Sequence, residues 1–112
     1  MQSPTKPYRF VFGVRFKTEK DLENYVKFWT ESSRLIQEEP GAQGTRLHRV
    51  EGELTVFAVA QWESKEARDR AFENLERKYA SEHPLNRDDG EFGEVFIIGG
   101  GSEIDAVFPS VL

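Results

Sequence analysis

The segment LTVFAVAQW, Leu54 to Trp62, is apolar on both sides of an extended chain. Successive side chains of a strand point to opposite faces of a sheet, so one face of this segment carries Phe57 and Val59. The opposite face carries Leu54, Val56, Ala58, Ala60 and Trp62. A strand with two apolar faces has to be covered from both sides, which indicates a sheet with material packed against each face.

Three more extended segments and two helical ones surround this strand. Alternating apolar residues predict a strand over 8–17, and residues 45–50 and 91–98 have the composition of strands. Thr18 is suited to cap a helix from Glu19 to Glu38, which Pro40-Gly41 would end. Ser64 is suited to cap a second helix, whose apolar stripe is Ala67, Ala71, Leu75 and Tyr79. The three glycines at 99–101 are expected to break the last strand and to act as a hinge.

The order strand, helix, strand, strand, helix, strand is the split βαβ pattern of ferredoxin-like folds. We therefore expect a single α+β domain over residues 1–112, with an antiparallel sheet of strand order 4-1-3-2 and two helices on one face. Residues 1–7 are expected to form a flexible N-terminus and residues 102–112 a C-terminal tail.

The face of the sheet away from the helices lacks cover within one chain. We assign to it Phe57 and Val59 of the quoted segment, together with Val95 and Ile97 of the last strand. Soluble monomers seldom expose an apolar surface of this size. We expect a homodimer with two identical sheets face to face, which is a dimeric α+β barrel; a monomer shielded by its own tail is the alternative.

Composition excludes several classes of function. The 15 Lys and Arg residues against 20 Asp and Glu give a net charge of −5, which argues against a nucleic-acid partner. The sequence has no cysteine, so disulfides, thiolate nucleophiles and cysteine-bound metals are excluded. No signal-peptide or membrane-spanning run is present, and we expect a cytoplasmic protein without membrane contact.

Three features in a fixed spacing resemble the antibiotic biosynthesis monooxygenase family: Pro40-Gly41, His48, and the segment Gln61-Trp62-Glu63-Ser64 followed by Glu66-Ala67. The likeness spans nearly the whole chain, and family members resemble dimeric α+β barrels. The resemblance implies oxygen chemistry without a metal, flavin or other cofactor. A phenolic, quinol-like or anthrone-like substrate is deprotonated, and its carbanion reduces dioxygen directly. The haem-degrading branch of the family fits less well, because the strand over 8–17 contains no asparagine and the second helix no histidine.

The resemblance also implies site residues. Trp62 matches a tryptophan that lines the pocket, and His48 matches a histidine on the adjacent strand; these are the candidate catalytic residues. Ala58 stands where quinone-forming members carry an asparagine, and Arg68 where they carry a tyrosine. The expected substrate pocket is formed by Tyr25, Trp29, Ala58, Ala60 and Arg68.

Each candidate has a purely structural interpretation. Trp62 could fill the core at the end of its strand. His48 lies between two arginines, and its side chain points opposite to Leu47, toward the dimer side if Leu47 is in the core. His83 is interpreted as a solvated loop residue. Two functions therefore stay open: a cofactor-independent monooxygenase of a small aromatic molecule, or a non-catalytic small-molecule-binding or stress-response dimer.

Overall fold

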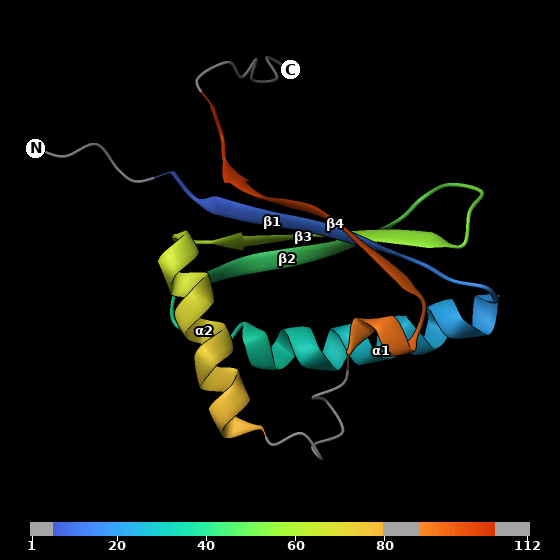
Figure 1. Cartoon of the computed structure of the whole chain (residues 1–112), viewed down its shortest axis with the longest axis horizontal. Coiled ribbons are helices and arrows are strands. Elements are labelled where there is room, and N and C mark those ends of the chain that lie inside the picture. The colour runs from blue at the N-terminus through green and yellow to red at the C-terminus, as the bar shows by residue number, and fades with distance from the viewer. Residues whose placement is uncertain (1–5, 80–87, 105–112) are drawn as a thin grey trace, which may run out of the picture.

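Four antiparallel strands form one sheet, and two helices lie against one of its faces (Figure 1). The computed structural model describes residues 6–79 and 88–104. Its elements are β1 (Tyr8–Arg15), α1 (Glu19–Ile36), β2 (Ala42–Arg49), β3 (Thr55–Trp62), α2 (Lys65–Lys78), the short 3₁₀ helix η1 (Asp89–Glu91) and β4 (Glu94–Ser102). The strand order is β2-β3-β1-β4, which confirms the predicted ferredoxin-like α+β topology.

The segments 1–5, 80–87 and 105–112 lie outside the described residues. The predicted N-terminal segment, the loop with His83 and most of the predicted tail fall within them. In the described part of the chain, no helix is long and apolar enough to cross a membrane.

Both helices begin at the predicted caps. Thr18 Oγ1 accepts a hydrogen bond from the Asp21 amide at 3.1 Å, and Ser64 Oγ accepts one from the Ala67 amide at 3.1 Å. α1 ends at Ile36, two residues before the expected end, because the Glu38 and Glu39 amide groups bond to carbonyls three residues back and tighten the chain into a turn.

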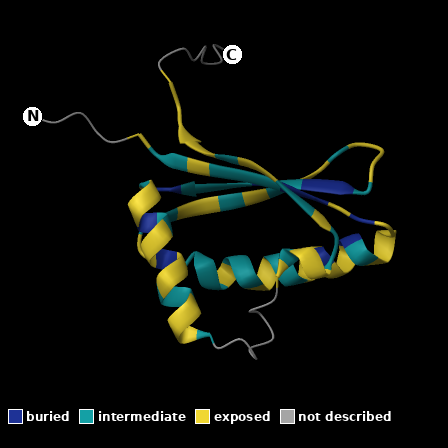
Figure 2. Ribbon diagram, in the orientation of Figure 1, coloured by how far each residue is buried: buried dark blue, intermediate teal, exposed yellow. Residues whose placement is uncertain are grey.

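The core lies between the sheet and the helices. Val14 and Val56 pair across β1 and β3 at 0% and 2% exposure, and Leu22 and Tyr25 of α1 pack against them. Phe16, which follows β1, has its ring centre 5.4 Å from that of Tyr25. Figure 2 shows that the helices turn their exposed residues away from the sheet. The amphipathic pattern of the helices thus places their apolar stripes as predicted.

The assignment of Val95 and Ile97 to the uncovered face was wrong. Val95 pairs with Val14 and Ile97 with Phe12, so both lie on the helix side of the sheet. Val95 packs against the core, whereas Ile97 is 67% exposed on the edge strand. Both sides of β4 are apolar, so strand alternation alone could not say which side faces the helices.

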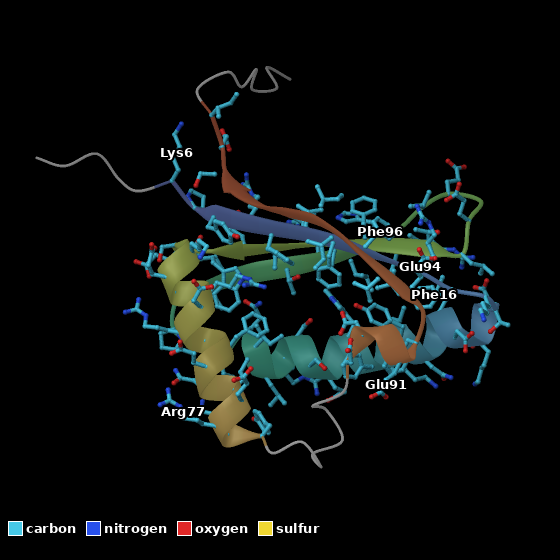
Figure 3. The ribbon with its side chains drawn as sticks, viewed as in Figure 1. Lys6, Phe16, Arg77, Glu91, Glu94 and Phe96 are labelled. Atoms are coloured by element: carbon cyan, nitrogen blue, oxygen red, sulfur yellow. The ribbon has the colours of Figure 1, made fainter. Side chains whose placement is uncertain are left out.

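The face away from the helices is apolar at its centre, where the side chains are Val11, Phe57, Val59 and Phe96. The Phe96 ring lies over Gly13, where any side chain would overlap it (Figure 3). The Arg15 guanidinium lies 4.6 Å from the centre of the Phe96 ring. Within the described residues, no second layer covers this face (Figure 1).

The glycine triplet continues β4 and is not a hinge. Gly99, Gly100 and Gly101 pair with β1 after an irregularity at which Ile98 is the extra residue. Gly99 has a φ of +127°, which a residue with a side chain rarely adopts. A side chain at Gly100 would overlap the ring of Tyr8. Glycine therefore allows the pairing here, because the strand must bend and approach a neighbouring ring closely.

Candidate functional site

A cavity of about 530 Å³ lies between the helices and the sheet. Its floor is formed by the helix side of the sheet, one wall by the second half of α1 and another by α2, with η1 contributing at one end. The aromatic side chains that line it are Phe10, Phe12, Phe28, Trp29, Trp62, Phe72 and Tyr79. A volume of this size suits a small organic molecule.

Trp62 is in the floor of this cavity and is also almost fully buried, at 2% exposure. Its ring centre lies 6.2 Å from that of Phe72 of α2. The indole N–H has no hydrogen-bond partner among residues 6–79 and 88–104. Trp62 is therefore both a packed core residue and part of the cavity lining. The core interpretation and the pocket interpretation of the sequence apply to different sides of the same ring.

The remaining predicted pocket residues divide into two groups. Trp29, Ala60 and Arg68 line the cavity. Ala58 and Tyr25 do not line it, and they are buried in the core at 1% and 0% exposure. Ala58 thus leaves no polar group where quinone-forming proteins of the resembled family carry an asparagine.

Arg68 brings a positive charge to the cavity. Its guanidinium lies 4.2 Å from the centre of the Phe10 ring and 4.8 Å from that of Phe72, which are cation–π distances. Its ion-pair partner, Asp69, is 3.7 Å away and forms a closer pair, at 3.0 Å, with Lys65. The Arg68 charge is therefore held mainly by aromatic faces, and it remains available to a ligand.

Asp89 brings a negative charge to the same cavity. One oxygen, Oδ2, accepts a hydrogen bond of 2.9 Å from the Tyr25 hydroxyl, across 64 positions of sequence. Burial raises the pKa of the Asp89 carboxyl; the hydrogen bond from Tyr25 opposes this rise, and the neighbouring charge of Asp88 adds to it. Burial also raises the pKa of Tyr25, with a further contribution from Asp89, so Tyr25 remains a hydrogen-bond donor at neutral pH.

Ser32 adds a hydroxyl to the wall that α1 provides. Its Oγ is buried and has no hydrogen-bond partner among the described residues. Two other polar residues of the lining are occupied, since Gln37 accepts from the Gly44 amide and Thr45 donates to the Val59 carbonyl. A buried unpaired hydroxyl is costly without a partner, so Ser32 is suited to bind a polar atom of a ligand.

His48 lies on the other face of the sheet. Its ring is exposed and stacks on Phe57, with ring centres 4.8 Å apart and planes inclined by 16°. Leu47 packs toward the core, so His48 points to the predicted dimer side and does not line the 530 Å³ cavity.

The sequence reasoning missed Asp89 and Ser32. Asp89 sits in a turn-rich stretch whose acidic residues resembled a solvated loop, and nothing local linked it to Tyr25. Ser32 lies on the apolar side of α1. A serine among apolar residues on a helix face indicates that one polar group points inward, so the sequence contained the information needed to find it.

Comparisons with known proteins connect this geometry to solved structures. No family model and no curated protein matches the chain. A dimeric ferredoxin-like protein from an uncultured marine organism matches with a TM-score of 0.71 and 17% identity over 97% of each chain. A variant of SnoaB, a cofactor-independent oxygenase from Streptomyces nogalater, matches with a TM-score of 0.73 and 14% identity over 95% of this chain and 100% of that one. A monooxygenase from Streptomyces coelicolor with nanaomycin D bound matches with a TM-score of 0.71 and 22% identity over 96% of each chain.

The chain has the fold of these oxygenases. The fold expected from the family resemblance is therefore confirmed. Proteins with one fold can differ in function, so the activity has to be argued from the side chains that line the cavity.

Proposed function

We propose that this protein binds a small aromatic molecule in the cavity under its sheet and oxidises it with dioxygen, without a metal or flavin. The observation that carries the proposal is the cavity itself, whose volume of about 530 Å³ and aromatic lining match a planar organic ligand. The fold that the chain shares with cofactor-independent oxygenases adds support.

The reaction uses the electrons of the substrate. With an anthrone-like substrate, a base removes a proton from the ring methylene, and the carbanion combines with dioxygen to give a peroxide. Loss of water from the protonated peroxide leaves a carbonyl, so one dioxygen molecule supplies one quinone oxygen and one water. The protein has to exclude water, orient the ring and accept the proton.

The proposed substrate contacts are Trp62, Trp29, Ala60 and Arg68, supported by their positions in the cavity lining. Tyr25 acts from behind this lining through its hydrogen bond to Asp89. We assign no chemical step to His48, because the sheet separates its ring from the cavity.

The protein also acts, in this proposal, as a homodimer. The apolar centre of the uncovered sheet face is suited to bury itself against a second copy, and similar solved structures are dimeric ferredoxin-like proteins. Two sheets in that arrangement form a dimeric α+β barrel.

A second candidate function is binding without catalysis. It is favoured by Ala58, which provides no hydrogen bond to a ligand where the resembled family has an asparagine, and by Arg68 in place of a tyrosine. In this case the cavity would bind the same class of molecule and leave it unchanged.

Oxygen uptake by the purified protein, measured with anthrones, quinols and phenols, tests the proposal. Binding is followed in parallel through tryptophan fluorescence, since both tryptophans line the cavity. Uptake above the uncatalysed rate supports the oxygenase, and binding without uptake supports the second function. Absence of both binding and uptake across the panel contradicts both.

A further inference from the structure

Two groups of opposite charge reach the cavity from different elements. Arg68 comes from α2 and lies over Phe10, near the start of β1. Asp89 comes from η1 and is bonded to Tyr25, whose ring packs on Phe16 just beyond the end of β1. Both groups line the 530 Å³ cavity, so a ligand in it can meet a cation from α2 and a carboxylate from η1.

Neither charge has a close ion-pair partner of its own among the described residues. Arg68 has a carboxylate partner only at 3.7 Å, and that carboxylate is already bound to Lys65. Asp89 is partly buried and next to a second acidic residue, Asp88, which makes its negative charge harder to hold. Charged groups in such surroundings cluster at functional sites.

We propose that Asp89 is the proton acceptor of this site and Arg68 its oxyanion-binding group, and that the substrate is a conjugated ring ketone whose acidic C–H and carbonyl oxygen lie at opposite ends. This inference rests on the proposed function for the presence of an aromatic ligand in the cavity. Anthrones have this arrangement, because the methylene and the carbonyl are on opposite corners of the central ring.

The step is a proton transfer. An oxygen of Asp89 takes the proton from the ring methylene, and the electron pair of the broken C–H bond enters the π system. The negative charge then develops on the carbonyl oxygen, which accepts hydrogen bonds from the Arg68 guanidinium. Reversal returns a proton from Asp89 to the carbon, so the step consumes no oxidant and can be studied without oxygen.

Tyr25 is the positioning residue of this step. Its hydroxyl donates to Asp89 at 2.9 Å and holds the carboxylate at the end of the cavity. Burial raises the pKa of Asp89, which makes it a stronger base than an exposed carboxylate. The other titratable groups near it are Asp88 in the same turn, and Glu76 and Tyr79 of α2 on the cavity wall.

Hydrogen–deuterium exchange in anaerobic D₂O isolates this proton transfer. The probe is 1,8-dihydroxyanthrone, and NMR follows loss of its methylene protons relative to a sample without protein. The wild-type protein should accelerate exchange, and Asp89→Asn should lower the acceleration by roughly 10²-fold or more, the usual contribution of a general base. Asparagine can still accept the Tyr25 hydrogen bond, so the variant should fold.

Two further variants separate the roles. Arg68→Gln should also slow exchange, with partial recovery in Arg68→Lys, since lysine keeps the charge but not the planar fork of donors. Tyr25→Phe removes the hydrogen bond that lowers the pKa of Asp89, so the pH midpoint of exchange should move upward. The matched control is Glu94→Gln, which neutralises an exposed carboxylate paired with Arg15 at the far side of the sheet. This variant should accelerate exchange of the methylene protons as much as the wild-type protein does.

The outcomes distinguish this inference from the proposed function. No acceleration by the wild-type protein, or full acceleration by Asp89→Asn, overturns the inference. Oxygen uptake that Asp89→Asn leaves unchanged overturns it as well, while the proposed oxygenase stands. If methylene exchange depends on Asp89 but the protein consumes no oxygen, the inference is supported and the oxidation step of the proposed function is contradicted.

Discussion

Truncation of Trp62 tests whether this residue serves the cavity or only the core. A fully packed tryptophan replaced by alanine usually costs about 3–5 kcal/mol of unfolding free energy. Trp62 is 2% exposed, but one side of its ring borders the cavity, so fewer contacts are lost than at a fully enclosed site. We expect Trp62→Ala to cost about 3 kcal/mol, which lowers the Tm of a domain of this size by roughly 12 °C.

The assay combines thermal unfolding with ligand binding. Trp62→Ala leaves Trp29 in the lining, and its fluorescence reports binding of 1,8-dihydroxyanthrone. We expect binding to be lost at a temperature at which the variant is folded. Trp62→Phe keeps most of the ring volume but removes the N–H donor, so we expect a cost near 1 kcal/mol and weakened binding.

The matched control is Leu22→Ala. Leu22 is buried at 6% exposure in the core but does not line the 530 Å³ cavity, and its truncation should cost about 2–5 kcal/mol. Binding by this variant should equal that of the wild type below its Tm. If folded Trp62→Ala binds as well as the wild-type protein, or if both variants lose binding only in proportion to unfolding, Trp62 belongs to the core alone and the reasoning is refuted.

Three further predictions concern the dimer and the carboxylates of Asp89 and Glu39. Val59→Asp should dissociate the proposed homodimer, because a buried unpaired charge costs several kcal/mol; sedimentation showing a wild-type monomer at all concentrations contradicts the dimer. Asp89→Asn should raise the Tm at neutral pH. The pKa of Asp89 is raised in the folded state, so ionisation of Asp89 destabilises the folded protein as pH rises through that pKa. The Tm difference between the variant and the wild type should vanish near about pH 3, and an unchanged Tm at neutral pH counts against this prediction. Lys78→Met should lower the Tm at neutral pH, since it leaves Glu39, 4% exposed, without the ammonium group 2.7 Å away. Lys78 holds the pKa of Glu39 below its usual value, so this loss should shrink as pH falls through the depressed pKa, and a pH-independent loss would argue against the pairing.

The topology could be predicted because its signals are local. Thr18 and Ser64 cap the two helices with the hydrogen bonds that their positions indicated. The orientation of β4 could not be predicted, because Val95 and Phe96 are both apolar and either side could face the helices. Pairing of the glycine triplet was missed for a different reason: glycine normally breaks strands, but Gly100 is needed where the Tyr8 ring lies against β4.

Cavity residues that share one strand were predicted from the sequence, whereas those brought together from distant elements were not. Trp62 and Ala60 share a face of β3, so strand alternation alone placed them together. Tyr25 was expected in the pocket but lies behind it, because the depth of a helical residue depends on how closely the helix approaches the sheet. Asp89 was missed because its partner is 64 positions away, a distance at which no spacing rule applies.

The contrast between Ala58 and Asp89 bears on whether this cavity performs chemistry. Ala58 removes a polar group from the interior of the sheet, which taken alone favours a site that only binds. Asp89 adds a carboxylate at another edge of the same cavity, where burial works against its charge and a tyrosine holds it in place. An ionisable group there, in the same cavity as a guanidinium that aromatic rings hold in place, favours the proposed proton transfer. If the proposed function holds, the polar group that acts on the substrate has a different position in this chain, and the exchange experiment decides whether Asp89 acts.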